Sequence, residues 1–170
     1  TKGEGEYTLY TPNPGWTEQD PLEWWSTTRD VIKKVVAQVN SDEIKGIGLT
    51  GQMHGSVFLD EAGNVIRPCI LWNDQRTYRE VESIMEMFGD KVLEWISNPV
   101  LTGFTLPKII WLKNNEPENF KRLKKVLLPK DFIRFKLTGE YATEVSDASG
   151  TALFDVKNRA WSIDMIKAME

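Results

Sequence analysis

Two short apolar runs in the chain each end abruptly in polar side chains. Residues 44–50 are apolar and interrupted by glycine, and Gly51-Gln52-Met53-His54-Gly55 follows them directly. Residues 65–72 form the second run, and the pair Asn73-Asp74 follows it. Runs of this length predict buried strands of an α/β sheet, and ligands commonly bind at strand ends because the loops there are free to carry chemistry. The pattern therefore predicts a mixed sheet with residues 52–55 on the side of a cleft.

Apolar positions repeat at helical spacing in several other segments. A first helix is predicted from Pro21 to about Asn40, with Asp20 as its N-cap and Glu23 completing a capping-box-like pattern. A second runs from residue 76 to 88, where a glycine stops it. The other predicted elements are strands at 56–59, 65–72, 125–128 and 152–156, helices at 92–96 and 131–137, a helix capped by Thr105 that reaches Asn114, and a polar loop at 143–151.

The composition predicts one globular unit without a nucleic-acid or membrane partner. The chain has 170 residues, of which 41% are hydrophobic, and its net charge is −4. No run approaches the roughly eighteen apolar residues that span a bilayer, and no signal pattern opens the chain, so we expect a cytoplasmic protein. Cys69, the single cysteine, is expected in the core. Because the chain lacks an initial Met and stops within an amphipathic run, we expect a piece of a longer chain.

The residues between Gly51 and Gly55 are candidates for binding a polyol. The glycines allow a tight turn and a close approach, while Gln52 and His54 supply donors and acceptors suited to hydroxyl groups. From the residues alone, a hairpin turn with a surface histidine is an equally good interpretation. No metal site is expected, because His54 is the only histidine and no cysteine pair accompanies it.

A second candidate lies after the apolar run 65–72. Trp72 could stack on the face of a sugar, and Asn73, Asp74 and Arg76 would then hydrogen-bond around its rim. The chain has seven tryptophans, most of which must be core, and that interpretation is slightly favoured for Trp72. Residues 146–151 could bind a phosphate through backbone N–H groups, but a structural turn is the better interpretation. No Walker-type or Gly-x-Gly-x-x-Gly phosphate loop occurs.

Six motifs together carry a resemblance to a known family. The chain resembles the FGGY carbohydrate kinases over nearly its whole length, with the motifs in the family's order. Within that family, Gln-Met-His at 52–54 is typical of the kinases that act on xylulose, whereas glycerol kinases have charged residues there. The motifs are Trp16-Thr17-Glu18-Gln19-Asp20-Pro21, Gly51-Gln52-Met53-His54-Gly55, Ile70-Leu71-Trp72-Asn73-Asp74, Gly103-Phe104-Thr105-Leu106-Pro107-Lys108, Val126-Leu127-Leu128-Pro129-Lys130-Asp131 and Ser146-Asp147-Ala148-Ser149-Gly150-Thr151.

The resemblance implies an α/β fold of the actin-like, ribonuclease-H-like type, with a mixed sheet flanked by helices. Residues 1–170 would form part of the N-terminal sugar-binding domain. The phosphate hairpin, the segment with the catalytic aspartate and the C-terminal domain would lie outside this chain. The chain alone is therefore expected to be inactive, and no catalytic residue is assigned within it. Asp147 is left without a role, because its motif differs from the family's catalytic segment.

The implied reaction is phosphorylation of D-xylulose to D-xylulose 5-phosphate with ATP and Mg²⁺, which would be bound mainly by parts outside this chain. Met53 and His54 match the family's sugar-contacting pair. The ketose is the expected partner, and a homodimer is left open. The alternative is a stand-alone sugar-binding or regulatory module of actin-like fold without phosphoryl transfer. Further candidates for the sugar site are Gln52, Trp72, Asn73, Asp74 and Phe104.

Overall fold

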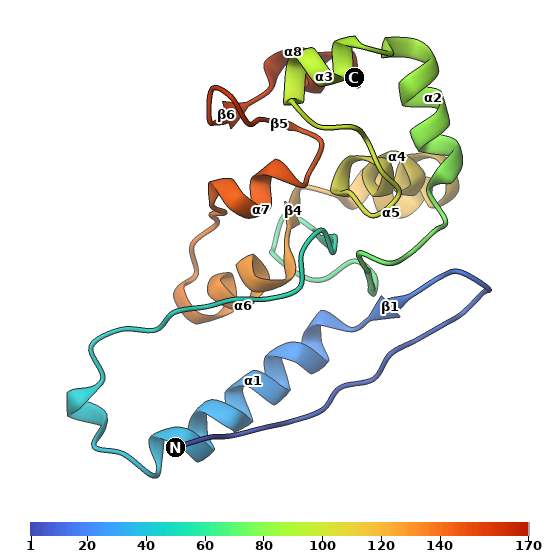
Figure 1. Ribbon diagram of the computed structural model, residues 1–170. Coiled ribbons are helices and arrows are strands. Elements are labelled where there is room, and N and C mark those ends of the chain that lie inside the picture. The colour runs from blue at the N-terminus through green and yellow to red at the C-terminus, as the bar shows by residue number, and fades with distance from the viewer. Residues whose placement is uncertain (170) are drawn as a thin grey trace.

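The computed structural model describes residues 1–169 and is mainly helical, with short strands (Figure 1). In these residues no helix is both long enough and apolar enough to cross a membrane. The helices are α1 (Pro21–Val36), α2 (Tyr78–Phe88), α3 (Lys91–Ile96), α4 (Thr105–Asn115), α5 (Pro117–Arg122), α6 (Pro129–Thr138), α7 (Val145–Ser149) and α8 (Ile163–Ala168), with a 3-10 turn at Ser41–Glu43. The strands are β1 (Glu18–Gln19), β2 (Val57–Leu59), β3 (Cys69–Ile70), β4 (Lys125–Leu127), β5 (Phe154–Asp155) and β6 (Ala160–Trp161).

The strands form three antiparallel pairs in the described part of the chain. β1 pairs with β3, β2 with β4, and β5 with β6. An isolated bridge between Ser56 and Ile70 joins the first two pairs side by side. The predicted hairpin at 56–72 forms around a turn in which the Asp60 N–H donates to the Asn64 carbonyl at 3.0 Å. In the described residues, every strand pairing between distant parts of the sequence therefore involves the segment 56–71.

The N-terminus of α1 forms as predicted, except for the capping box. The Asp20 carboxylate accepts a hydrogen bond from the Leu22 N–H at 2.8 Å, which satisfies one of the free donors of the first turn. Glu23 does not complete a capping box. Its carboxylate accepts instead from the Thr8 N–H at 2.9 Å and the Tyr10 hydroxyl at 2.7 Å, and so ties the extended N-terminal segment to α1.

Two other local predictions are wrong. Thr105 does not cap α4. It is the first helical residue, the cap position belongs to Phe104, and no side chain closes that end. The predicted polar loop at 143–151 contains α7, because the Glu144 carboxylate accepts from the N–H groups of Ser146 and Asp147 and nucleates a short helix.

The segment 44–50 is not the buried strand that its apolar pattern predicts. It forms neither helix nor strand, and Ile44, Ile47 and Leu49 are exposed, Ile47 by 66%. Figure 1 shows it in cyan as an extended trace from the end of α1 towards α6. A strand needs a backbone partner, and among residues 1–169 no strand pairs with this segment. The apolar side chains consequently lack a covering layer here.

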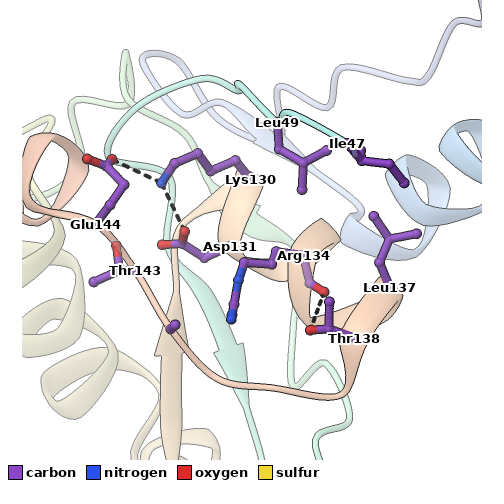
Figure 2. A pocket seen from close by; sticks show the side chains of 10 residues that line it. Ile47, Leu49, Lys130, Asp131, Arg134, Leu137, Thr138, Thr143 and Glu144 are labelled. Carbon is purple, nitrogen blue, oxygen red and sulfur yellow. Dashed lines mark hydrogen bonds and ion pairs between the residues drawn. The ribbon is translucent and has the colours of Figure 1, made fainter. Parts of the chain in front are cut away.

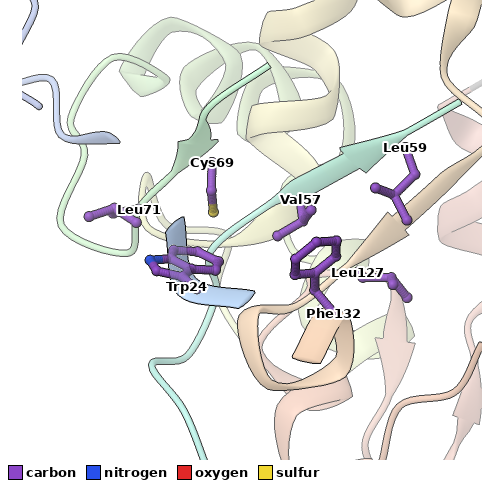
Figure 3. Packing of buried hydrophobic residues seen from close by; sticks show 7 residues of the cluster. All are labelled: Trp24, Val57, Leu59, Cys69, Leu71, Leu127 and Phe132. Atoms are coloured by element: carbon purple, nitrogen blue, oxygen red, sulfur yellow. The ribbon is translucent and has the colours of Figure 1, made fainter. Parts of the chain in front are cut away.

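The hydrophobic core that supports the 51–55 loop lies where α1, β2, β3, β4 and α6 meet (Figure 3). Phe132 of α6 points into this cluster and is 1% exposed. Cys69 is fully buried there, as predicted, and its burial raises the pKa of the thiol to about 12. The members are Trp24, Val57, Leu59, Cys69, Leu71, Leu127 and Phe132. A second cluster, between α2, α3, α4 and α8, contains Ile84, Val92, Ile96, Val100, Leu106, Ala152 and Met165.

Candidate functional site

The loop 51–55 turns sharply at His54, which has a φ of 60°. This left-handed conformation is uncommon for a residue with a side chain and has to be held by its surroundings. The flanking glycines allow other atoms to approach this loop closely, and the atoms that do so at Gly55 belong to the protein itself. A Cβ at Gly55 would lie 2.7 Å from the Pro129 ring and 3.1 Å from the Cys69 sulfur, so the loop packs directly on the start of α6 and on β3.

The imidazole of His54 is half-buried and packs against Phe104, with the ring centroids 4.8 Å apart and tilted by 38°. Its Nδ1 is buried and has no hydrogen-bond partner among the described residues. Burial lowers the pKa of His54, and the positive charge of Lys108 lowers it further. The ring is therefore neutral at neutral pH, when one of its nitrogens can donate and the other accept a hydrogen bond.

α7 closes the other side of this ring. Gly150 follows α7 directly, and a Cβ built at this position would overlap the Cε1 and Nδ1 atoms of the His54 imidazole. Phe104, which precedes α4, and Gly150 therefore hold the ring between them. Three motifs that lie far apart in the sequence meet at this histidine.

Met53 and Trp72 are exposed, by 49% and 48% respectively. Large apolar side chains that stay exposed beside polar groups are typical of interaction sites. Gln52 is partly buried, and its side-chain amide donates to the side-chain Oε1 of Gln19 at 2.8 Å. The Asn73 side chain is exposed and accepts from the Thr17 hydroxyl at 2.8 Å.

The expectation that Asp74 and Arg76 present polar groups to a ligand is corrected by their burial. The Asp74 carboxylate is fully buried and accepts from the Arg76 guanidinium and from the N–H groups of Thr17 and Arg76, at 2.7 to 2.9 Å. The Arg76 guanidinium lies over the Trp16 ring at 3.8 Å and also pairs with Glu18 at 2.8 Å. Both side chains fix the turn that carries Trp72, because their charges are used inside the protein.

The burial of Lys108 was not apparent from the sequence. This side chain is fully buried in α4, and its ammonium donates to the backbone carbonyls of His54 at 2.8 Å and Gly103 at 2.7 Å. No carboxylate in the described residues lies within ion-pair distance of it, and burial lowers its pKa to about 8. The only signal in the sequence is a lysine on the apolar side of a predicted helix, which periodicity alone does not separate from a surface lysine.

A hollow of about 550 Å³ lies beside the start of α6 (Figure 2). Ile47 and Leu49 line one part of it, and Lys130 lines another part together with Asp131 and Glu144. The Lys130 ammonium pairs with Asp131 at 2.9 Å, Asp147 at 2.6 Å and Glu144 at 3.3 Å. Asp147 is thus engaged in an ion pair at α6. None of the sugar-site candidates lines this hollow.

Within residues 1–169, no group of three or more His, Cys, Asp or Glu side chains is placed to hold a metal ion. Asp147, whose negative charge acts on His54, is paired with Lys130.

Comparison with known proteins gives close relatives along the whole chain. It is 47% identical over 161 residues to a xylulose kinase of Staphylococcus xylosus and 42% identical over 163 residues to one of Escherichia coli. These matches cover 94% and 96% of this chain but only 33% and 34% of the relatives. The chain thus spans about a third of the length of these curated relatives.

Solved structures agree with the sequence relatives. The fold matches a crystal structure described as a xyloylose kinase from Brucella ovis with a TM-score of 0.93 and 43% identity, covering 98% of this chain and 34% of that one. It also matches a xylulose kinase from Rhodospirillum rubrum with a TM-score of 0.89 and 28% identity, covering 96% and 35%. The α/β fold is therefore the actin-like fold of the sugar kinases, as predicted. The model of the N-terminal domain of the FGGY family of carbohydrate kinases matches residues 1–170, and the chain belongs to this family.

Proposed function

We propose that this chain is the sugar-binding portion of a kinase that phosphorylates D-xylulose to D-xylulose 5-phosphate with ATP. The observation that carries the proposal is His54, a neutral imidazole that is fixed between Phe104 and Gly150 and stays only half-buried, next to the exposed Met53. A sugar hydroxyl is the kind of group that the accessible part of a neutral imidazole can bind. The xylulose kinases at 42 to 47% identity support the choice of this ketose.

In this proposal, Met53 and His54 contact the sugar, and Gln52, Trp72, Asn73 and Phe104 complete the wall around it. Asp74 contributes by holding the turn that carries Trp72 and Asn73. The phosphate hairpin, the catalytic aspartate and the C-terminal domain lie in parts outside this chain, which also bind ATP and Mg²⁺. The bound nucleotide supplies the transferred phosphoryl group. The work of residues 1–170 is to bind and orient the ketose and to exclude water from it.

Replacing His54 by Ala in the full-length protein tests this function. Loss of a hydrogen bond to a buried polar partner is worth about 1 to 3 kcal/mol, so we expect kcat/KM for the ketose to fall roughly 5- to 150-fold. The KM for ATP should change little. Met53→Ala should also weaken ketose use, while Met87→Ala, an exposed methionine on α2, should not. Unchanged ketose kinetics in the His54→Ala enzyme would show that the sugar does not bind at this loop.

Two further measurements separate the proposal from a stand-alone sugar-binding or regulatory module. Residues 1–170 alone should show no ketose-dependent formation of ADP. Calorimetric titration of the full-length protein with xylulose should show binding, and turnover should require ATP. Binding without turnover in the full-length protein would favour the module instead.

A further inference from the structure

Lys108 joins two loops that carry different parts of the proposed sugar site. Its ammonium donates one hydrogen bond to the His54 carbonyl at 2.8 Å and another to the Gly103 carbonyl at 2.7 Å. His54 belongs to the loop after 44–50, whereas Gly103 directly precedes Phe104, whose ring packs on the imidazole. One buried cation therefore sets both the backbone of the histidine and the start of the segment that holds its ring.

The geometry of His54 makes such a restraint necessary. Its φ of 60° is sparsely populated for a residue with a side chain, and such conformations persist only where the surroundings determine them. A carbonyl fixed by a charged donor is held more firmly than one fixed by a neutral donor. The Gly55 N–H donates to the Met53 carbonyl at 2.7 Å and closes a three-residue turn around His54, whose own carbonyl accepts from Lys108.

It is unusual for a lysine to be buried without an ion pair. Lys108 is fully buried in α4 and makes no ion pair in the described structure. Lysines are almost never fully buried unless they are paired, because the charged form loses its hydration. Two backbone carbonyls are its partners instead, and both belong to loops of the proposed site.

We propose that Lys108 is a positioning residue for ketose binding, which fixes the left-handed turn at His54 and aligns the imidazole against Phe104. This role rests on the function proposed above. Lys108 itself does not touch the sugar, since its side chain is fully buried and its ammonium donates to the carbonyls of the two loops. Its effect on the reaction passes through His54 and its neighbours in the loop.

The test is a double-mutant cycle in the full-length protein with Lys108→Met, which keeps the length of the side chain and removes the donor. We expect kcat/KM for the ketose to fall about 5- to 50-fold, mostly through KM, while the KM for ATP stays unchanged. In a His54→Ala background the same change should cost several-fold less, because the group that it positions is gone. The matched control is Lys113→Met, an exposed lysine on the same helix, which should leave both KM values unchanged.

Each outcome decides between the two proposals. An equal fall in kcat/KM with and without the His54 side chain would overturn the positioning role, because Lys108 would then act independently of His54. If Lys108→Met has no effect on ketose kinetics while His54→Ala does, the positioning role fails and the proposed function stands. If His54→Ala has no effect, both fail.

A second variant and a measurement on the native protein cover the case in which Lys108→Met does not fold. Lys108→Gln retains a shorter donor and should give an intermediate loss of ketose kcat/KM. In the native protein, the KM for the ketose should rise relative to the KM for ATP as the pH passes about 8, where the Lys108 ammonium loses its proton. The titratable and charged groups that act on it are the Cys69 thiol of β3, Asp74 and Arg76 of the following turn, and His54. A ratio of the two KM values that stays constant up to pH 10.5, the ordinary pKa of a lysine, would overturn the proposal.

Discussion

Gly150 offers a way to move the His54 imidazole without altering its chemistry. The residue follows α7 with a φ of −89°, a conformation open to any amino acid, so alanine is compatible with the backbone. The three atoms nearest to a Cβ at this position all belong to the ring of His54, whose Cε1 and Nδ1 atoms occupy the space that it would need. Gly150→Ala should therefore force the imidazole out of its position between Phe104 and Gly150 while the rest of the chain stays in place.

The size of the effect follows from the contacts that the ring would lose. An aromatic pair contributes about 0.5 to 1.5 kcal/mol beyond its burial, and a side chain forced off its rotamer costs about as much. We therefore expect Gly150→Ala to lower the free energy of unfolding by about 1 to 3 kcal/mol. The displaced imidazole would no longer face the sugar, so kcat/KM for the ketose should fall roughly 5- to 150-fold, as for His54→Ala.

Denaturant unfolding and steady-state kinetics of the full-length protein measure the two effects. The control is the same substitution in a His54→Ala protein, where the Cβ of residue 150 meets no ring. There Gly150→Ala should change the free energy of unfolding by less than about 0.5 kcal/mol, and ketose kinetics should not fall further. The reasoning is refuted if Gly150→Ala is equally destabilising with and without the imidazole, because the clash would then lie elsewhere.

Three other predictions follow from buried groups. Phe132→Ala should lower the free energy of unfolding by about 3 to 5 kcal/mol, measured in urea, and a loss below about 1 kcal/mol would contradict its place in the core. Because burial raises the pKa of Cys69 to about 12, an alkylating reagent should leave this thiol unmodified in the native protein and label it after unfolding, which peptide mass spectrometry can follow. Lys108→Met should raise the pKa of His54, since a nearby positive charge is removed. An NMR titration, with the His54→Ala protein as the reference for assignment, should detect the change. An unaltered pKa would contradict the proximity of Lys108 to His54.

The longer helices, α1, α2, α4 and α6, were the part of the fold that the sequence could predict, whereas the short helices α5, α7 and α8 were not predicted. Asp20 at the start of α1, Gly89 at the end of α2 and Gly139 at the end of α6 mark helix boundaries through local effects, a side-chain cap in the first case and a positive φ in the other two. Such signals act within a few residues, so no knowledge of the rest of the chain is needed. The prediction of a strand at 44–50 failed for the opposite reason. A strand exists only with a neighbouring strand, and an apolar pattern does not indicate whether one is present.

The candidate site was predictable only in outline. The spacing of glycines around His54 indicated a turn with polar groups, and the turn is there. That Asp74 is enclosed by Arg76 and backbone donors could not be predicted, because a carboxylate after a strand looks the same in the sequence whether it faces a ligand or the interior. Its partner Thr17 lies more than fifty residues away. Burial of charge is a property of the fold, not of local sequence.

The energetics of Lys108 indicate that it contributes more to the positions of the loops around His54 than to the stability of the fold. Lowering its pKa from 10.5 to about 8 corresponds to about 3 kcal/mol against the protonated form at neutral pH. This penalty is fully present below pH 8 and is relieved as the pH rises towards 10.5, since the unfolded chain binds the proton more tightly in that range. The two carbonyls that it satisfies would each cost about 1 to 3 kcal/mol if left buried and unpaired. These contributions nearly cancel, so the net stability gained from the lysine is small, whereas the two carbonyls that it fixes both belong to the loops around His54.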